Sequence, residues 1–212
     1  MITTQELINK VRYLINETDA DAGISLITDD MRSIDDTIIK LLPQAVAIVQ
    51  KQSNGKQVNV KKILPPYVTL NELSNGVYAI LLPSDFAALV SIKLYSWKTP
   101  CVEISLPDSA EARYKFGGNA SAVSLRPVCV EDFTSGGEKV LKLFPASSSD
   151  RLSHFVYEAQ FNALYGLNAC DNRMVDAVSY VCAALLYNVF ERYDAAKTFM
   201  SFATALCGED VR

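Results

Sequence analysis

The sequence has very little of the chemistry on which most catalytic and metal sites depend. It contains one histidine, His154, in 212 residues. Zinc and non-haem iron sites draw on several histidines or on cysteines at fixed spacing, and the chain has neither. The phosphate-binding patterns G-x-x-x-x-G-K-[ST] and G-x-G-x-x-G are also missing. We therefore predict that the protein is not an enzyme and has no metal, no cofactor and no catalytic residue.

Cysteine is sparse and irregularly spaced. The five cysteines form no C-x-x-C pair; they are Cys101, Cys129, Cys170, Cys182 and Cys207. An odd, dispersed set in apolar surroundings is typical of reduced thiols in a protein made in the cytoplasm. Because Cys182 lies inside an apolar run, we expect it in the core.

Two catalytic pairings stay open as an alternative. A Ser-His-Asp triad would have to use His154, although no G-x-S-x-G elbow accompanies it. A thiol enzyme could pair His154 with Cys170, whose place near a helix start could lower its thiol pKa. Cys170 is equally a small residue of the kind found at helix starts. An intracellular hydrolase that depends on His or Cys is therefore one alternative function.

Excess charge and long apolar runs are absent as well. The chain carries 20 Lys and Arg against 24 Asp and Glu, a net charge of −4, which argues against nucleic-acid binding driven by bulk charge. The most apolar stretch, residues 177–190, is shorter than the ~18–20 residues of a membrane span. The first residues lack the basic and apolar regions of a secretory signal. With half of its residues hydrophobic, the chain is expected to fold as a soluble protein with a real core and no membrane partner.

Hydrophobic periodicity divides the chain into three parts of one composite domain: a helical part over residues 1–75, a β-rich part over 76–160 and a helical part over 161–212. Thr3 and Glu6 have capping-box spacing and precede the first helical pattern. A second helical pattern covers residues 34–49, where Pro43 is expected to kink or divide the helix. From Asn172 apolar residues cover more than half of a helix circumference, so this helix should be buried on several sides.

Strand patterns fill the middle of the chain, at residues 77–82, 89–97, 127–130, 138–144 and 154–158. Residues 135–138 give a hairpin turn signal, and the last strand is expected to pair back on its neighbour. Strands that follow one another without intervening helices imply an antiparallel sheet. The predicted fold class is α+β, with N- and C-terminal helical parts that form a bundle around a central antiparallel β insertion.

Three features of the sequence occur in the same order in one known family of proteins. The first is Leu-Pro-Ser-Asp-Phe at residues 82–86, which leads into the strand pattern that reaches Trp97. The second is Arg-Pro-Val-Cys-Val at 126–130, followed by Glu-Lys-Val-Leu-Lys-Leu-Phe-Pro-Ala at 138–146 and His-Phe-Val-Tyr at 154–157. The third is the helical start and the closing helical pair. In this pattern the chain resembles the head-to-tail adaptor, or neck connector, proteins of tailed bacteriophages.

The resemblance implies a structural protein of the virion, made in the host cytoplasm and placed at the head–tail junction. It implies a homo-oligomeric ring, twelve-fold by family resemblance, that joins the portal protein to the tail or to further neck proteins. Such a ring passes DNA without sequence readout. The mild negative charge suits a conduit, because a wall that bound phosphate strongly would retard the duplex.

A ring subunit needs surfaces that meet its neighbours, and exposed aromatic side chains suit such contacts. On the strand over 89–97 we expect one exposed face, formed by Lys93, Tyr95 and Trp97. Over 187–202 we expect helix-mediated contacts, from Tyr187, Phe190, Tyr193 and Phe199. The alternative for these aromatics is that they fill the chain's own core. An alternative function is a regulatory module whose middle sheet captures a peptide by edge pairing, which predicts a stable monomer.

Overall fold

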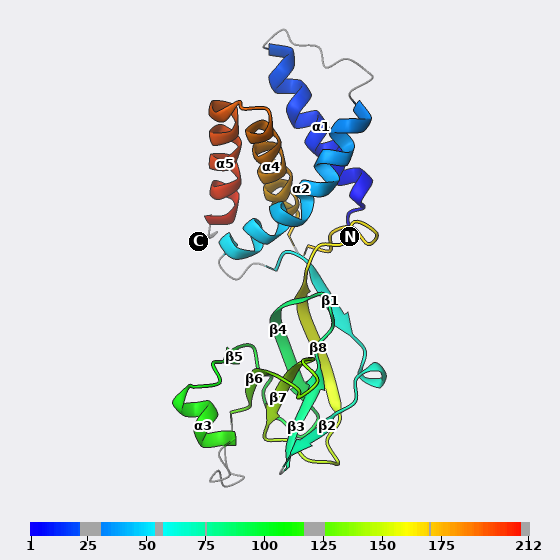
Figure 1. Ribbon diagram of the computed structural model, residues 1–212, viewed down its shortest axis with the longest axis vertical. Coiled ribbons are helices and arrows are strands. Elements are labelled where there is room, and N and C mark those ends of the chain that lie inside the picture. The colour runs from blue at the N-terminus through cyan, green and yellow to red at the C-terminus, as the bar shows by residue number, and fades with distance from the viewer. Residues whose placement is uncertain (22–30, 54–56, 75, 117–125, 170, 209–212) are drawn as a thin grey trace. The chain divides into compact units, whose positions relative to one another are not determined.

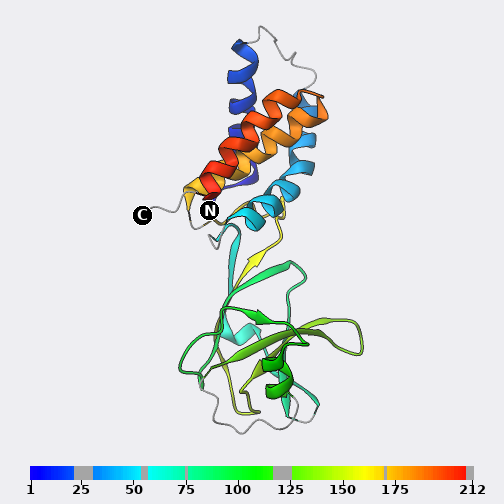
Figure 2. The same cartoon turned by 90° about the vertical axis from the view of Figure 1, so that its left-hand side faces the viewer.

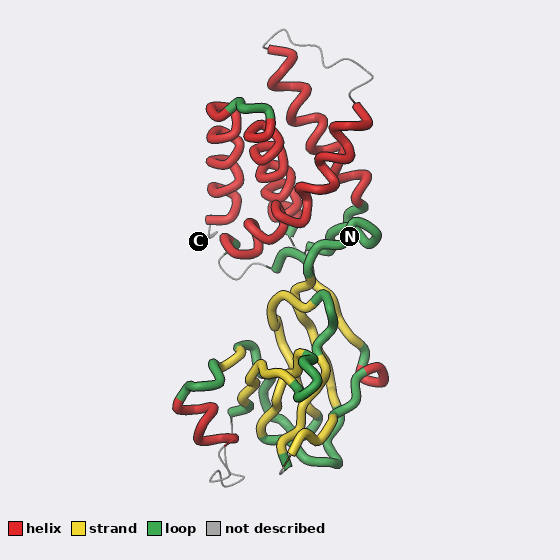
Figure 3. The backbone as a smooth tube through the Cα atoms, in the orientation of Figure 1, coloured by secondary structure: helices red, strands yellow, loops and turns green. Residues whose placement is uncertain are grey.

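A computed structural model of the chain describes residues 1–21, 31–53, 57–74, 76–116, 126–169 and 171–208. The chain has an α+β fold and divides into two compact units. Helices gather in Met1–Val60 with Gln160–Arg212, the helical unit, and strands in Lys61–Ala159, the β unit (Figure 3). The sequence placed the end of the first helical part at residue 75, whereas strands already occur from Val60 onward.

The helix α1 (Thr4–Asp21) begins at the capping box predicted from the sequence. The Thr3 backbone N–H donates to Glu6 Oε2 at 2.7 Å, and the Glu6 backbone N–H donates to the Thr3 hydroxyl at 3.2 Å. Two N–H groups without a partner inside the helix are satisfied in this way. The backbone hydrogen bond from Thr3, followed by the one from its hydroxyl, holds the pKa of the Glu6 carboxyl below its ordinary value.

The helices α1, α2 (Met31–Gln52), α4 (Asn172–Val189) and α5 (Tyr193–Gly208) share one hydrophobic core. The helix α2 continues through Pro43, so of the two outcomes expected for this proline, division of the helix is wrong. Asp171 caps α4 by accepting the Arg173 backbone N–H at 2.9 Å. As predicted, α4 is buried on several sides, because α1, α2 and α5 all pack on it. Figures 1 and 2 show α5 lying along α4.

A short bridge ties the N-terminus of the chain into the helical unit. The Ile2 N–H donates to the Leu167 carbonyl at 2.8 Å, and the Leu167 N–H donates back to the Ile2 carbonyl at 2.9 Å. Gly166, next to the bridge, has a φ of 68°. A Cβ atom at Gly166 would lie 2.3 Å from the Ile2 carbonyl oxygen, so the close approach of the two segments requires glycine.

Gly166→Ala is therefore expected to lower the free energy of unfolding of the helical unit by roughly 1–3 kcal/mol. Gly208→Ala is the matched control, since a Cβ atom there meets open space. Urea unfolding followed by circular dichroism at the helix signal measures both variants. Equal midpoints for the two variants would contradict the structural role of Gly166.

The strands of the β unit form two sheets, one of three strands and one of five. The three-stranded sheet has the order β1 (Val60–Ile63), β8 (Leu152–Ala159), β4 (Phe86–Leu94). The five-stranded sheet has the order β2 (Asn71–Ser74), β3 (Val77–Leu81), β7 (Lys139–Phe144), β6 (Val128–Phe133), β5 (Ile104–Ser105). The strands β6 and β7 form the predicted hairpin, and Gly137 in its turn has a φ of 82°.

Two details of the predicted sheet are wrong. The strand β8 pairs with β4 and β1 and not with the preceding β7, because residues 145–151 carry the chain from one sheet to the other. The short β5 pairs parallel to β6, so this sheet is mixed. The sequence pattern gave no sign of the shorter elements β1, β2, β5, the 3₁₀ helix η2 (Pro65–Tyr67) and α3 (Ala110–Phe116), because they are too short to show a period.

Both sheets face one hydrophobic core. Its aromatic centre is formed by Phe86 of β4 with Phe155 and Tyr157 of β8, whose ring centroids lie 5.4–6.3 Å apart. At the rim of this cluster the Tyr157 hydroxyl donates to Asp85 Oδ1 at 2.8 Å, and Lys61 forms an ion pair with the same carboxylate. Burial raises the pKa of Asp85, but the hydrogen bonds from Lys61 and Tyr157 together outweigh it and leave the pKa below its ordinary value.

A carboxyl group with a lowered folded-state pKa stabilises the fold where it is charged. The contribution of Asp85 should be complete above its ordinary pKa of 3.8 and be lost as the pH falls below that value toward the lowered one. Asp85→Asn is thus expected to destabilise the β unit at neutral pH and to approach the parent protein in acid. Urea unfolding, followed through the single Trp97 of the β unit, measures this difference against pH. Asp108→Asn, at a nearly fully exposed side chain, is the control; an Asp85 effect that does not shrink in acid would contradict the linkage.

Candidate interaction surface

Of the three residues predicted on one exposed strand face, Trp97 was placed wrongly, because it is buried. The strand β4 ends at Leu94, and the chain then turns, with the Trp97 N–H donating to the Leu94 carbonyl at 3.1 Å. The turn sends Trp97 into the core of the β unit, where it is 5% exposed and its indole N–H donates to the Pro145 carbonyl at 2.5 Å. Tyr95 is exposed, and Lys93 is half-buried on β4.

The four aromatic residues predicted to make helix contacts are likewise partly buried and partly exposed. Tyr187 is 2% exposed and stacks on Phe199 with ring centroids 5.4 Å apart. The Tyr187 hydroxyl donates to the Ile15 carbonyl of α1 at 3.4 Å. These two aromatics are therefore core residues of the helical unit, because α4 is covered by its neighbours along most of its length.

Phe190 and Tyr193, by contrast, are exposed where α4 passes into α5. Together with Val189 they form a surface that we name the α4–α5 corner, whose side chains are 46–58% exposed. Large apolar side chains that are exposed close together in the sequence, next to a well-packed core, favour an interaction site.

The backbone of the corner is held by local hydrogen bonds. The Glu191 N–H donates to the Asn188 carbonyl at 3.1 Å, and the Arg192 N–H donates to the Tyr187 carbonyl at 2.9 Å. Glu191 has a φ of 59°, the left-handed conformation that reverses the chain after a helix. Because the backbone of the turn is fixed in this way, little backbone freedom is left to lose on binding.

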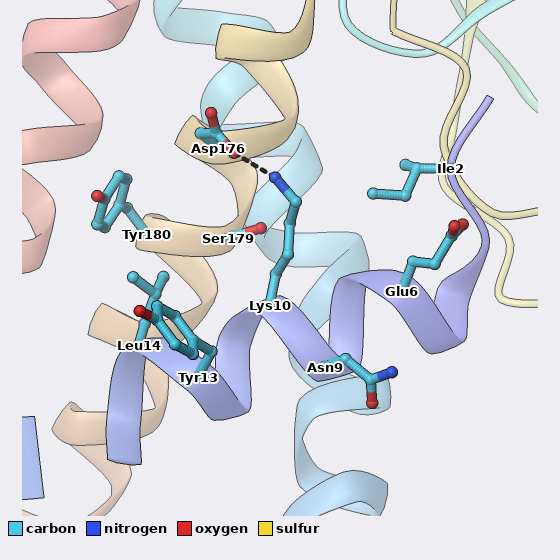
Figure 4. A pocket seen from close by; sticks show the side chains of 9 residues that line it. All are labelled: Ile2, Glu6, Asn9, Lys10, Tyr13, Leu14, Asp176, Ser179 and Tyr180. Atoms are coloured by element: carbon cyan, nitrogen blue, oxygen red, sulfur yellow. Dashed lines mark hydrogen bonds and ion pairs between the residues drawn. The ribbon is translucent and has the colours of Figure 1, made fainter. Parts of the chain in front are cut away.

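A second surface of the helical unit is concave. It is a groove of about 640 Å³ between α1 and α4, which we name the α1/α4 groove (Figure 4). It is lined by Ile2, Glu6, Asn9, Lys10, Tyr13, Leu14, Asp176, Ser179 and Tyr180. Its volume falls in the range of sites that take a small ligand or a few side chains of a partner.

The groove combines apolar walls with one ion pair. Lys10 of α1 reaches across to Asp176 of α4, with Nζ 2.5 Å from Oδ1 (Figure 4). Both side chains are more than two-fifths exposed, so their pairing contributes ~0–1 kcal/mol and yields readily to a docking partner. Tyr180 is supported from behind by Phe199 and Phe202 of α5, at centroid distances of 6.0 and 5.7 Å.

One contact bears on the alternative that the protein is a hydrolase dependent on His154. His154 Nε2 lies 3.1 Å from the Ser91 hydroxyl across β8 and β4. Burial, followed by the charges of Lys62 and Lys93, lowers the pKa of His154, which favours the neutral ring. Among the described residues no carboxylate hydrogen-bonds this ring, so the third member of a triad is missing there. Cys170, the proposed thiol partner, lies outside the described residues.

Within the described ranges, no three His, Cys, Asp or Glu side chains come close enough to hold a metal ion. Nor does any helix there have both the length and the apolar character needed to cross a membrane. Comparison of the sequence with protein-family models and with curated proteins gives no match.

Proposed function

We propose that the protein is a structural subunit of a phage head–tail neck, forming a homo-oligomeric ring, twelve-fold by family resemblance, at the head–tail junction of the virion. In this proposal the ring joins the portal protein to the tail or to further neck proteins, forms part of the DNA conduit without sequence readout, and catalyses no reaction. The observation that carries the proposal is the α4–α5 corner: Val189, Phe190 and Tyr193 are exposed on a hydrogen-bonded turn.

The same proposal includes a finer view of the fold, in which the helical parts form a bundle and the β unit is an insertion into it. Two facts support this view. The helices α1, α2, α4 and α5 contribute to one core, although residues 61–159 separate α2 from α4 in the sequence. The inserted residues also have a separate core of their own.

A ring requires a head-to-tail contact, in which one surface of a subunit meets a different surface of the next. We propose that the convex α4–α5 corner of one copy docks into the concave α1/α4 groove of the next copy. Both surfaces belong to the helical unit, so each contact would repeat the same rotation between neighbours and could close a ring. Burying an apolar side chain contributes ~1.5–3 kcal/mol, and the corner offers three exposed ones.

The proposed function is tested by co-sedimentation with portal rings from the phage that encodes the protein. The parent protein should sediment with these rings at a fixed stoichiometry. The control is a portal ring whose lower rim has been removed by proteolysis, to which binding should be lost. Equal recovery with intact and with truncated rings, or no recovery with either, would contradict a role below the portal.

Edge pairing with a peptide remains a second candidate because of the outer edge of β4. This strand lies at the end of the order β1-β8-β4, and the Ile92–Cys101 bridge covers its edge near one end. Ala87 and Ala88, toward the other end, are exposed and uncharged. A protein that works through this edge should be monomeric and should lose its peptide when Ala88 is replaced by proline, whereas ring assembly should not depend on that residue.

A further inference from the structure

Glu191, in the turn between α4 and α5, occupies a position where the backbone favours glycine. The hydrogen bonds from the Glu191 and Arg192 N–H groups to the carbonyls of residues 188 and 187 form a Schellman motif. Glu191 is the left-handed residue of this motif, with a φ of 59°, and such a residue is usually glycine or asparagine because other side chains are strained there.

The side chain of Glu191 has no role within the single chain. It is exposed, and its carboxylate forms no ion pair or hydrogen bond with the residues that the structure describes. A strained residue whose side chain stabilises nothing in the monomer is better explained by a contact outside it. The opposite charge for such a contact has to come from another molecule.

The α1/α4 groove holds a positive charge that suits this carboxylate. Lys10 reaches across the groove from α1 to Asp176 on α4, with Nζ 2.5 Å from Oδ1 (Figure 4). The side chains are 44% and 45% exposed, so the ion pair lies open to solvent and is weak in the free chain. A partner that fills the groove takes water away from Lys10, and a carboxylate on that partner replaces the lost hydration.

The α4–α5 corner brings such a carboxylate with it. Glu191 lies between Phe190 and Tyr193 in the sequence, so a corner that docks into the groove carries one negative charge beside its apolar side chains. We propose that Lys10 changes partner on assembly, leaving Asp176 to pair with Glu191 of the next copy. This ion pair selects a second copy of the chain as the occupant of the groove. The inference rests on the proposed function, because it requires the corner-in-groove contact.

Reversing the two charges tests the pair. Lys10→Glu and Glu191→Lys should each weaken self-association of the full chain on the order of 100-fold, because each brings like charges together in the contact. A chain with both substitutions has opposite charges again and should associate within about tenfold of the parent protein. Sedimentation velocity measures association, and circular dichroism verifies the fold. The matched control is Glu138→Lys, at an exposed carboxylate of the β unit, which should associate like the parent protein.

Asp176→Asn distinguishes a change of partner from a structural role of the groove ion pair. If the pair served only to hold α1 against α4, its removal would weaken self-association. If Lys10 has to leave Asp176 on assembly, removal of the competing carboxylate should tighten self-association by roughly threefold, since an exposed ion pair is worth less than tenfold. Weaker association of Asp176→Asn would contradict the change of partner.

A cross-linking measurement on the parent protein requires no substitution. A carbodiimide joins an amine directly to a carboxylate that lies against it, with loss of water. In dilute, unassembled protein the link should join Lys10 to Asp176, whose charged atoms are in contact. In assembled protein a link between Lys10 and Glu191 should replace it. Mixing isotope-labelled with unlabelled chains should show that this second link joins two copies.

The outcomes separate this inference from the proposed function. Assembled particles in which Lys10 remains linked to Asp176, or a doubly substituted chain that does not regain association, would overturn the change of partner and leave the ring itself standing. A parent protein that stays monomeric, with and without portal rings, would contradict the proposed function and this inference with it.

Discussion

Phe190→Glu is expected to abolish self-association of the protein while leaving its helical unit folded. The Phe190 side chain is 46% exposed and lies on the hydrogen-bonded turn of the α4–α5 corner. Removing one buried apolar side chain from the contact and burying a charge there should weaken it on the order of 100-fold or more. Sedimentation velocity over a concentration series measures the loss, and circular dichroism verifies the fold.

The matched control is Phe133→Glu, which places the same charge on a phenylalanine of the β unit that is 58% exposed, against 46% for Phe190. This variant should assemble like the parent protein. A contact that survives Phe190→Glu, or that is lost equally in Phe133→Glu, would show that the corner is not the interface.

A complementation experiment distinguishes the head-to-tail contact from a symmetric one. Tyr13→Glu introduces a charge into the α1/α4 groove from an exposed position on α1 and should also prevent assembly. Each of the two variants keeps one intact surface, so a mixture of Phe190→Glu and Tyr13→Glu should form one-to-one dimers that grow no further. A symmetric contact of corner against corner would be left intact by Tyr13→Glu alone, so that variant would assemble without mixing.

Tyr187→Ala is expected to lower the free energy of unfolding of the helical unit by ~3–5 kcal/mol. Tyr187 is among the largest fully buried side chains, stacks on Phe199 and donates its hydroxyl to a carbonyl of α1. Its removal would leave a cavity between α4, α5 and α1. Urea unfolding monitored at the helix signal gives the size of the effect.

Tyr193→Ala serves as the control for Tyr187→Ala. It removes the same kind of side chain from an exposed position at the start of α5, so its effect on stability should stay within about 0.5 kcal/mol. Replacing Tyr187 should therefore lower the stability of the helical unit, whereas replacing Tyr193 should weaken self-association and leave stability nearly unchanged. A small stability effect for Tyr187→Ala would contradict the buried position of Tyr187 between α4 and α5.

Local signals in the sequence predicted the start of α1, the extent of α4 and the β6–β7 hairpin, because caps, helical periodicity and turn residues act over a few positions. The alternation that suggested an outward-facing Trp97 failed because β4 ends at Leu94, and alternation has no meaning beyond the last paired residue. Strand pairing was harder to predict, since the partner of β8 depends on where the chain crosses between the sheets.

The exposure of the predicted contact residues was predictable in part. Tyr187, Phe190 and Tyr193 were all predicted as contact residues, because they are aromatics near the bend between the last two helices. The structure exposes Phe190 and Tyr193, which follow the last covered turn of α4, and buries Tyr187, which lies just before it. The α1/α4 groove left no signal, since periodicity shows which face of a helix is apolar but not how much of it the neighbouring helices cover.

The proposal that the protein forms a ring through its helical unit is tested most directly by its mass in solution. Light scattering over a concentration series, with negative-stain imaging of the largest species, should find annular particles of about a dozen subunits, either free or assembled on added portal rings. A protein that remains monomeric at every concentration, with and without portal rings, would contradict the proposal.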